Sequence, residues 1–148
     1  MVEAYDHDND KKVALKIGKD LMQEFEAAKP LSHRNIAKYE ACYSITDSSV
    51  GLKDYAIMQL YPKGNLSELL KNIKLNDKQL KDITRGILEG LQYLHSQNRI
   101  HRDFKPSNIL VTKLPNGSYR PLIADFGLTK IVGENDYVEG SDVELSDG

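Results

Sequence analysis

The segment that decides the fold reads His-Arg-Asp-Phe-Lys-Pro-Ser-Asn, from His101 to Asn108. Downstream of it comes Asp125-Phe126-Gly127, and upstream lies Val-Ala-Leu-Lys, from Val13 to Lys16. Taken singly, the two outer motifs are weak, because a lysine at a strand end usually only reaches solvent and Asp-Phe-Gly after a strand is often a turn. The middle motif is more specific. It is improbable that the three motifs occur together in this order by chance.

Strand patterns dominate the first 60 residues of the chain. Residues 11–17 alternate and are rich in aliphatic side chains, and the polar residues 6–10 before them predict a hairpin loop. Residues 20–29 place apolar side chains on one helical face and are followed by Pro30, so we expect a short helix there. Residues 39–45 and 55–60 predict two more strands, separated by a polar loop at 46–54.

Helical patterns follow a Tyr-Pro-Lys-Gly break at residues 61–64. Residues 66–73 predict a short helix. Asn76 and Gln79 form an Asn-x-x-Gln variant of the capping box, so a longer helix is expected to begin there. Apolar residues recur along it at three- and four-residue steps and predict one buried stripe, made of Leu80, Ile83, Ile87, Leu91 and Leu94. After it, residues 108–112 and 119–124 predict a strand pair joined through Pro-Asn-Gly.

Composition excludes several classes of function. The 148 residues carry 20 Lys and Arg against 22 Asp and Glu, a net charge of −2, so bulk charge gives no reason to expect nucleic acid or an anionic membrane as partner. Cys42 is the single cysteine, which rules out a disulfide within the chain and favours a reducing compartment. No stretch is long and apolar enough to span a bilayer. We therefore expect a cytoplasmic location, or a cytosol-facing one if the parent protein is a membrane sensor.

The order and the residues of the three motifs resemble the signature set of the eukaryotic protein kinases. The resemblance implies an α+β, bilobal kinase-like fold. Residues 1–60 would form part of a small β-rich lobe, residues 61–132 the first part of a helical lobe, and residues 133–148 a flexible acidic tail that begins the activation segment. A lysine at the position of Lys105 resembles the serine/threonine-directed branch of the family. Tyrosine-directed kinases usually carry an Ala or Arg pattern at this position.

The resemblance assigns a role to each charged residue of the motifs. Lys16 would hold the α- and β-phosphates of ATP, and Asp103 would take or orient the proton of the substrate hydroxyl. Lys105 would balance charge at the γ-phosphate. Asn108 and Asp125 supply oxygen ligands of the kind that Mg²⁺ prefers, and antiparallel pairing of the predicted hairpin would bring them together. The implied reaction is transfer of the ATP γ-phosphate to Ser/Thr hydroxyls of a protein substrate.

The resemblance also implies an adenine slot. Ala14 and Leu110 would line its two apolar faces and Met58 would guard its rear, while the backbone of Gln59, Leu60 and Tyr61 would form a hinge that bonds adenine. For Ala14, Leu110 and Met58, ordinary core packing explains each residue equally well when taken alone. His101 and Phe126 are expected to be apolar packing elements.

One expected ion pair stays open at this point. Counting back from the His-x-Asn-Ile turn at residues 33–36 places Glu24 as the helix glutamate that pairs with Lys16. Only eight positions separate the two residues, fewer than usual in the family. Glu26 is a poor substitute because it points to a different helical face, and both glutamates can simply be solvated acids.

The chain also departs from the family pattern. No Gly-x-Gly-x-x-Gly loop occurs in it, and nothing resembling Ala-Pro-Glu follows Asp125. We therefore expect an incomplete kinase domain with weakened nucleotide affinity. The alternative is a pseudokinase or a kinase-like binding module without turnover. The hairpin at residues 112–119 and the wording of residues 102–130 also look somewhat like the unfolded-protein-sensing kinase/ribonucleases of the endoplasmic reticulum.

Overall fold

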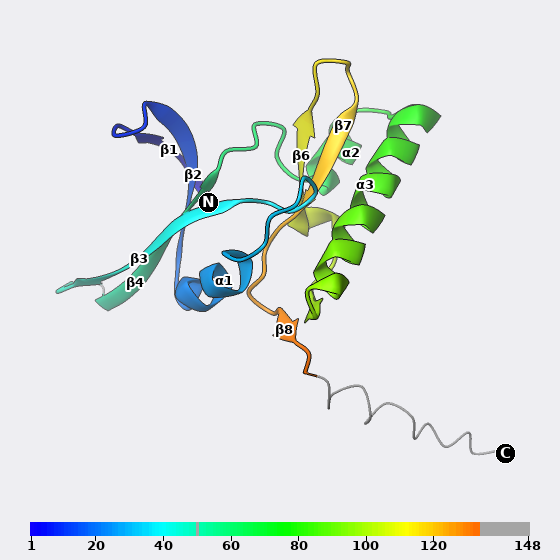
Figure 1. Ribbon diagram of the computed structural model, residues 1–148. Coiled ribbons are helices and arrows are strands. Elements are labelled where there is room, and N and C mark those ends of the chain that lie inside the picture. Colours follow the sequence, from blue (N-terminus) through cyan, green and yellow to red (C-terminus); the bar gives the residue numbers. More distant parts are fainter. Residues whose placement is uncertain (50, 134–148) are drawn as a thin grey trace, which may run out of the picture.

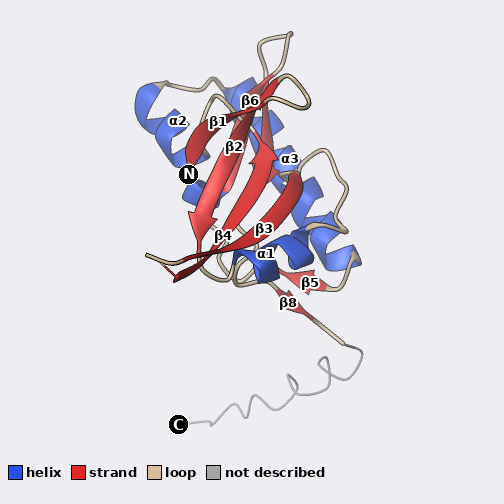
Figure 2. Ribbon diagram, turned by 90° about the vertical axis from the view of Figure 1, so that its left-hand side faces the viewer, coloured by secondary structure: helices blue, strands red, loops and turns tan. Residues whose placement is uncertain are grey.

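A four-stranded antiparallel sheet with one helix against it forms the first part of the fold (Figures 1 and 2). This computed structural model describes residues 1–49 and 51–133. The sheet has the order β1-β2-β4-β3, and α1 packs against β3 and β4. Its elements are β1 (Val2–Asp6), β2 (Lys11–Gly18), α1 (Leu21–Ala28), β3 (Tyr39–Asp47) and β4 (Gly51–Gln59).

The second part of the fold is built on a long helix and a two-stranded hairpin. The helix α3 packs against β7, and the hairpin pairs β6 with β7. The α+β fold class is therefore confirmed. The elements are α2 (Leu66–Asn72), α3 (Asp77–Ser96), β5 (Arg99–Ile100), the 3₁₀ turn η1 (Pro106–Asn108), β6 (Ile109–Lys113), β7 (Tyr119–Ile123) and β8 (Lys130–Ile131). Within the described residues, no helix has the length and apolar character needed to cross a membrane.

The polar loop predicted at residues 46–54 is wrong. β3 runs on to Asp47 and β4 already begins at Gly51. The outer ends of the two strands project past α1 (Figure 1), where polar side chains are tolerated on both faces and the apolar alternation fades. Asp54 therefore lies inside a strand, on the same face as Ala56 and Met58.

The start of α3 is as predicted. The Asn76 side chain accepts a hydrogen bond from the Gln79 amide at 2.8 Å, and the Gln79 side chain accepts one from the Asn76 amide at 3.0 Å. These two bonds satisfy backbone donors that the first helical turn leaves free. A second capping box, formed by Asn65 and Glu68 at the start of α2, was not predicted.

The predicted stripe along α3 is only partly buried. Ile83 and Leu94 are buried, but Leu80 is 44% exposed. Gly86 and Gly90 complete the buried face instead. Because glycine has no side chain, these two positions let the helix approach β7 and the segment before β3 closely, and an apolar pattern cannot reveal them.

Substitution of Gly90 by alanine is expected to lower the free energy of unfolding. A Cβ atom there would lie 2.9 Å from the Asn35 carbonyl oxygen and 2.9 Å from Ile123 Cδ1. Overpacking of this kind costs about 1–3 kcal/mol. That outweighs the gain of about 1 kcal/mol or less that alanine brings in helix propensity. Urea denaturation measures the difference, with Lys81→Ala on the exposed face of α3 as the control. Stability equal to that of the control would contradict this close contact.

Backbone hydrogen bonds between β7 and the segment that leads into β3 join the two parts of the fold. The Ile123 amide donates to the Asn35 carbonyl at 2.8 Å, and the Ala37 amide donates to the Ile123 carbonyl at 2.8 Å. The buried Asn35 side chain also donates to the Pro121 carbonyl at 2.8 Å. β7, and with it the Asp-Phe-Gly segment that follows, is thereby fixed to the chain that leads into the sheet.

Candidate active site

The charged residues singled out from the sequence form two clusters, and a backbone hydrogen bond joins the segments that carry them. Lys16 on β2 and Glu24 on α1 lie with Asp125, which follows β7. Asp103 and Lys105 lie in the loop before η1, close to Asn108, the last residue of η1. The Ala124 amide, next to Asp125, donates to the Asn108 carbonyl at 2.9 Å and holds the two clusters side by side.

The open question about Glu24 is answered by its geometry. The Lys16 ammonium donates to both carboxylate oxygens, at 2.9 and 2.7 Å. The Glu24 side chain is only 4% exposed. The short spacing is sufficient because α1 begins at Leu21, soon after β2 ends at Gly18, so the first helical turn carries Glu24 back over Lys16. Glu26 is exposed on the other side of the helix.

Asp125 completes this cluster from the other part of the fold. Its Oδ1 lies 3.6 Å from Lys16 Nζ, and its side chain is 42% exposed. The Asp125 backbone has φ 63°, which is uncommon for a residue with a Cβ atom. Arg102, in the middle motif, has the same φ of 63°. Backbone strain of this kind persists where the surrounding structure enforces it, and it gathers at functional sites.

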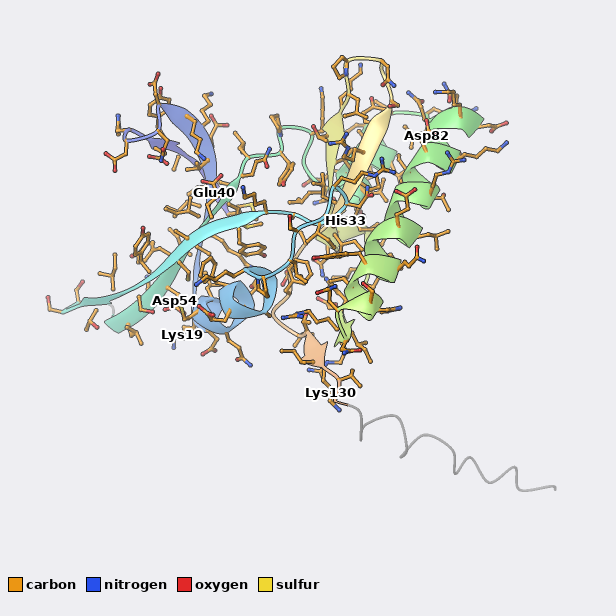
Figure 3. All side chains as sticks on the ribbon, in the orientation of Figure 1. Lys19, His33, Glu40, Asp54, Asp82 and Lys130 are labelled. Carbon is orange, nitrogen blue, oxygen red and sulfur yellow. The ribbon has the colours of Figure 1, made fainter. Side chains whose placement is uncertain are left out.

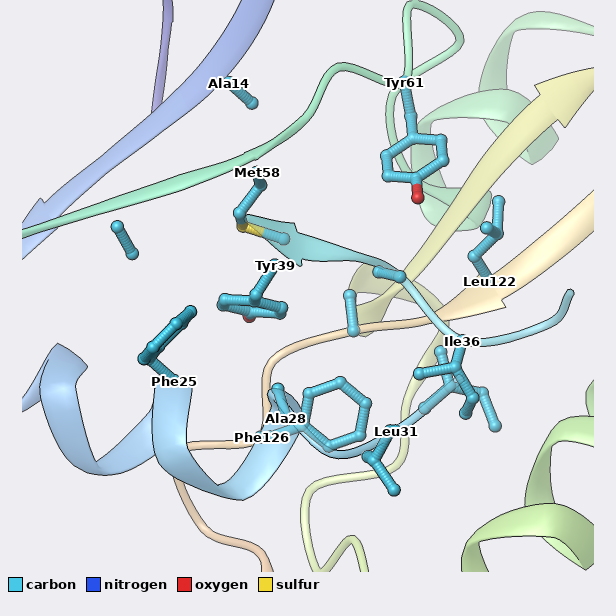
Figure 4. Packing of buried hydrophobic residues seen from close by; sticks show 14 of the residues in the cluster. Ala14, Phe25, Ala28, Leu31, Ile36, Tyr39, Met58, Tyr61, Leu122 and Phe126 are labelled. Carbon is cyan, nitrogen blue, oxygen red and sulfur yellow. The ribbon is translucent and has the colours of Figure 1, made fainter. Parts of the chain in front are cut away.

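Tyr39 is a member of the cluster that the sequence did not reveal. Its hydroxyl donates to Glu24 Oε1, so Glu24 is held by both Lys16 and Tyr39. Burial, followed by the nearby Glu24 charge, raises the pKa of Tyr39, which keeps the hydroxyl protonated as a donor. Figure 4 shows Tyr39 between Met58 and Phe126, and its ring meets that of Phe126 edge-on at 6.1 Å.

The second cluster fixes the Asp103 carboxylate. Asn108 Nδ2 donates to Asp103 Oδ2 at 2.9 Å, and Lys105 Nζ lies 3.2 Å from Asp103 Oδ1. These bonds, that from Lys105 first, hold the pKa of Asp103 below its ordinary value. The side chain is therefore an anion at neutral pH, with one oxygen shared with an amide and the other with an ammonium group.

His101 contacts the backbone of both clusters. Its Nδ1 accepts from the Asp103 amide at 3.2 Å, and its Nε2 lies 2.8 Å from the Ala124 carbonyl. An acceptor at Nδ1 leaves the ring proton on Nε2, which donates to that carbonyl. The buried ring also meets Phe126 edge-on at 5.4 Å. Phe126 is buried as an apolar packing element, as predicted, whereas the prediction of a purely apolar role for His101 is wrong, because both of its ring nitrogens make polar contacts.

The donor set at Asn108 and Asp125 fits a magnesium ion. Nδ2 of the Asn108 side chain donates to the carbonyl and to the carboxylate of Asp103, which leaves Oδ1 as the oxygen that a metal could bind. Asp125 contributes a partly exposed carboxylate. Residues 1–49 and 51–133 contain no group of three or more His, Cys, Asp or Glu placed to hold a metal. Mg²⁺ needs only one or two carboxylates, because water and phosphate oxygens complete its shell.

The residues predicted to surround adenine lie along β2, β4 and β6. Ala14 and Met58 are buried cross-strand partners, and Leu110 is half-buried at a bridge with Asn65. Two of the predicted hinge groups are already engaged within the chain. The Gln59 amide donates to the Lys38 carbonyl at 3.2 Å, and the Tyr61 carbonyl accepts from Gly64 at 3.0 Å. Leu60 is half-buried between them. The adenine slot itself stays a prediction.

Comparisons with known proteins point in one direction. Residues 2–142 match a family model described as the protein kinase domain. Mitogen-activated protein kinase kinase kinase 1 of Arabidopsis thaliana is 37% identical over 113 residues, which are 76% of this chain and 17% of that protein. A probable myosin light chain kinase of Dictyostelium discoideum is 36% identical over 120 residues, 80% of this chain and 36% of that protein.

Serine/threonine-protein kinase Tao of Drosophila melanogaster is 34% identical over 114 residues, 76% of this chain and 10% of that protein. The chain therefore spans at most 36% of the length of these three relatives.

Proposed function

This chain belongs to the protein kinase family, and we propose that it transfers the γ-phosphate of ATP to serine and threonine hydroxyls of proteins. One observation carries the proposal. Lys16, paired with the buried Glu24, lies 3.6 Å from Asp125, and one backbone bond links the segment of Asp125 to Asn108 and the Asp103 loop. Phosphoryl transfer depends on positioning and charge neutralisation more than on covalent chemistry.

Lys16 and Asp125 serve the phosphates in this proposal. Glu24 fixes the position of the Lys16 ammonium, which holds the α- and β-phosphates. Asp125 and Asn108 would hold Mg²⁺, which when bound supplies positive charge to neutralise the triphosphate. The exposed side of Asp125 leaves room for the phosphate oxygens and water.

Asp103 serves the acceptor hydroxyl. Its carboxylate is held by Asn108 and Lys105, so it keeps one orientation toward an incoming hydroxyl, whose proton it would take or orient. The Lys105 side chain is 53% exposed, and from its position beside Asp103 its ammonium would balance charge at the γ-phosphate. The adenine ring would lie between Ala14 and Leu110, in front of Met58. The proposed partners are ATP and a protein substrate, and no nucleic acid is needed. The proposed location is cytoplasmic.

The acceptor residue provides the test of this function. Lys105 leads us to expect label from ATP mainly on serine and threonine of a general protein substrate. Phosphoamino-acid analysis measures this, with an Asp103→Asn protein as the background control. Label mainly on tyrosine would overturn the assignment. Binding of Mg-ATP without any transfer would show a kinase-like binding module instead.

A further inference from the structure

The helix that carries Glu24 begins without a cap of its own. α1 is only eight residues long, from Leu21 to Ala28. Asp20 precedes it with φ 60°, and its side chain makes no capping hydrogen bond. The first amides of an α-helix have no partner inside the helix, so they need an acceptor from elsewhere.

That acceptor comes from the sheet. Asp54 on β4 lies beside the start of α1 (Figure 3), and its Oδ2 accepts from the Met22 amide at 3.1 Å. Its Oδ1 accepts from the hydroxyl of Ser44, the residue opposite it on β3, at 2.5 Å. Asp54 is buried. A carboxylate fixed in this way is a helix cap supplied by another element, and its negative charge also suits the positive end of the helix.

The cap and the ion pair share one turn of helix. Met22, which bonds Asp54, lies two residues before Glu24, which binds Lys16 through both oxygens. A two-turn helix has few backbone hydrogen bonds and little stability of its own. A movement of its first turn away from β4 would therefore break the Met22 bond and carry Glu24 away from Lys16.

We propose that Asp54 is a positioning residue, which caps α1 from the sheet and thereby holds Glu24 against Lys16. Ser44 orients the Asp54 carboxylate, so that α1 is held to both β3 and β4. The device gives this chain an assembled Lys16–Glu24 pair without contact from any other molecule. Its structural part stands without catalysis, and only its effect on ATP use rests on the proposed function.

Hydrogen exchange tests the structural part directly. In Asp54→Ala, the backbone amides of residues 25–29 are expected to exchange about 2- to 30-fold faster, the range that loss of a helix cap produces. Ser44→Ala should give a smaller change in the same direction. Asp20→Asn is the matched control, because it alters a carboxylate at the same helix end that makes no capping bond. Amides of β6 and β7 report on global unfolding.

Two results would overturn the proposal. One is exchange in α1 that stays at the rate of the Asp20→Asn control. The other is acceleration of the β6 and β7 amides by the same factor, which would make Asp54 a residue of general stability only.

The link to Glu24 needs a separate readout. With the protein active on ATP, Asp54→Ala should raise KM for ATP several-fold more than it lowers kcat, and the same substitution should add nothing in a Glu24→Gln background. An equal effect in both backgrounds would show that Asp54 does not act through Glu24. A protein without any transfer would sink the proposed function, yet the exchange result for α1 would still decide the cap.

Discussion

Replacing Asp125 with asparagine is expected to reduce phosphate transfer by about 10²–10³-fold or more, because loss of one preorganised charge at the reacting phosphates costs at least that much. The variant keeps the size of the side chain and one oxygen. It loses the negative charge that lies 3.6 Å from Lys16 and would bind Mg²⁺ together with Asn108. Initial rates at increasing Mg²⁺ concentration measure the effect. We expect the remaining activity to require more Mg²⁺ than the wild-type protein does.

Asp82→Asn is the matched control for this substitution. Asp82 lies on α3 in an exposed pair with Lys78, away from both clusters, and such pairs contribute little. Its rate should equal that of the wild-type protein. A near wild-type rate in Asp125→Asn, with unchanged need for Mg²⁺, would contradict the role of Asp125.

Replacing Lys16 with methionine is expected to cause a loss of transfer of similar size, for a different reason. Methionine keeps an unbranched stem of similar length but removes the ammonium group that would hold the phosphates. It also leaves Glu24, 4% exposed, without its cation, and an unpaired buried charge is costly. Both the rate of transfer and the free energy of unfolding should fall, as measured by enzyme assay and urea denaturation.

A second substitution separates these two losses. Glu24→Gln added to Lys16→Met removes the unpaired charge, so stability should recover while transfer stays lost. Lys12→Met, in an exposed pair with Glu3 on the neighbouring strand, is the control and should leave both quantities unchanged. Transfer restored by the double substitution would show that Lys16 acts only through stability.

The sequence predicted most of the charged site because its chemistry lies in short segments. Asp103 and Asn108 are five residues apart, and the hairpin of β6 and β7 returns the chain to Ala124, whose amide donates to the Asn108 carbonyl just before Asp125. Local pairing rules are enough to infer that neighbourhood. The roles of these residues are set by the family resemblance and remain predictions for this chain.

The residues that hold Glu24 could not be predicted in the same way. Tyr39 and Asp54 are distant from Glu24 in sequence, and their polar atoms meet it or its helix only after α1 has packed on the sheet. The prediction of a loop at residues 46–54 assigns Asp54 to no face of the sheet, because a loop has no regular alternation of side chains. With residues 51–59 taken as a strand, Asp54 falls on the inward face with Ala56 and Met58, and an inward carboxylate signals that a partner must exist.

The residue ranges predicted for the two lobes and the tail can be compared with the structure only in part. β4 ends at Gln59 and α2 begins at Leu66, on either side of the predicted boundary between residues 60 and 61, while the assignment of residues 1–60 and 61–132 to two lobes stays a prediction. Residues 134–148, where most of the acidic tail was predicted, lie outside the described residues.

In the proposed function, the two clusters form one working phosphoryl-transfer site. The most direct test measures transfer of label from γ-labelled ATP to a protein substrate, by the purified protein at the length at which cells make it. Wild type and Asp125→Asn are compared, with and without Mg²⁺. The account predicts Mg²⁺-dependent label on serine and threonine that disappears in the variant. Equal label from the two proteins, or none from the wild type, would contradict it.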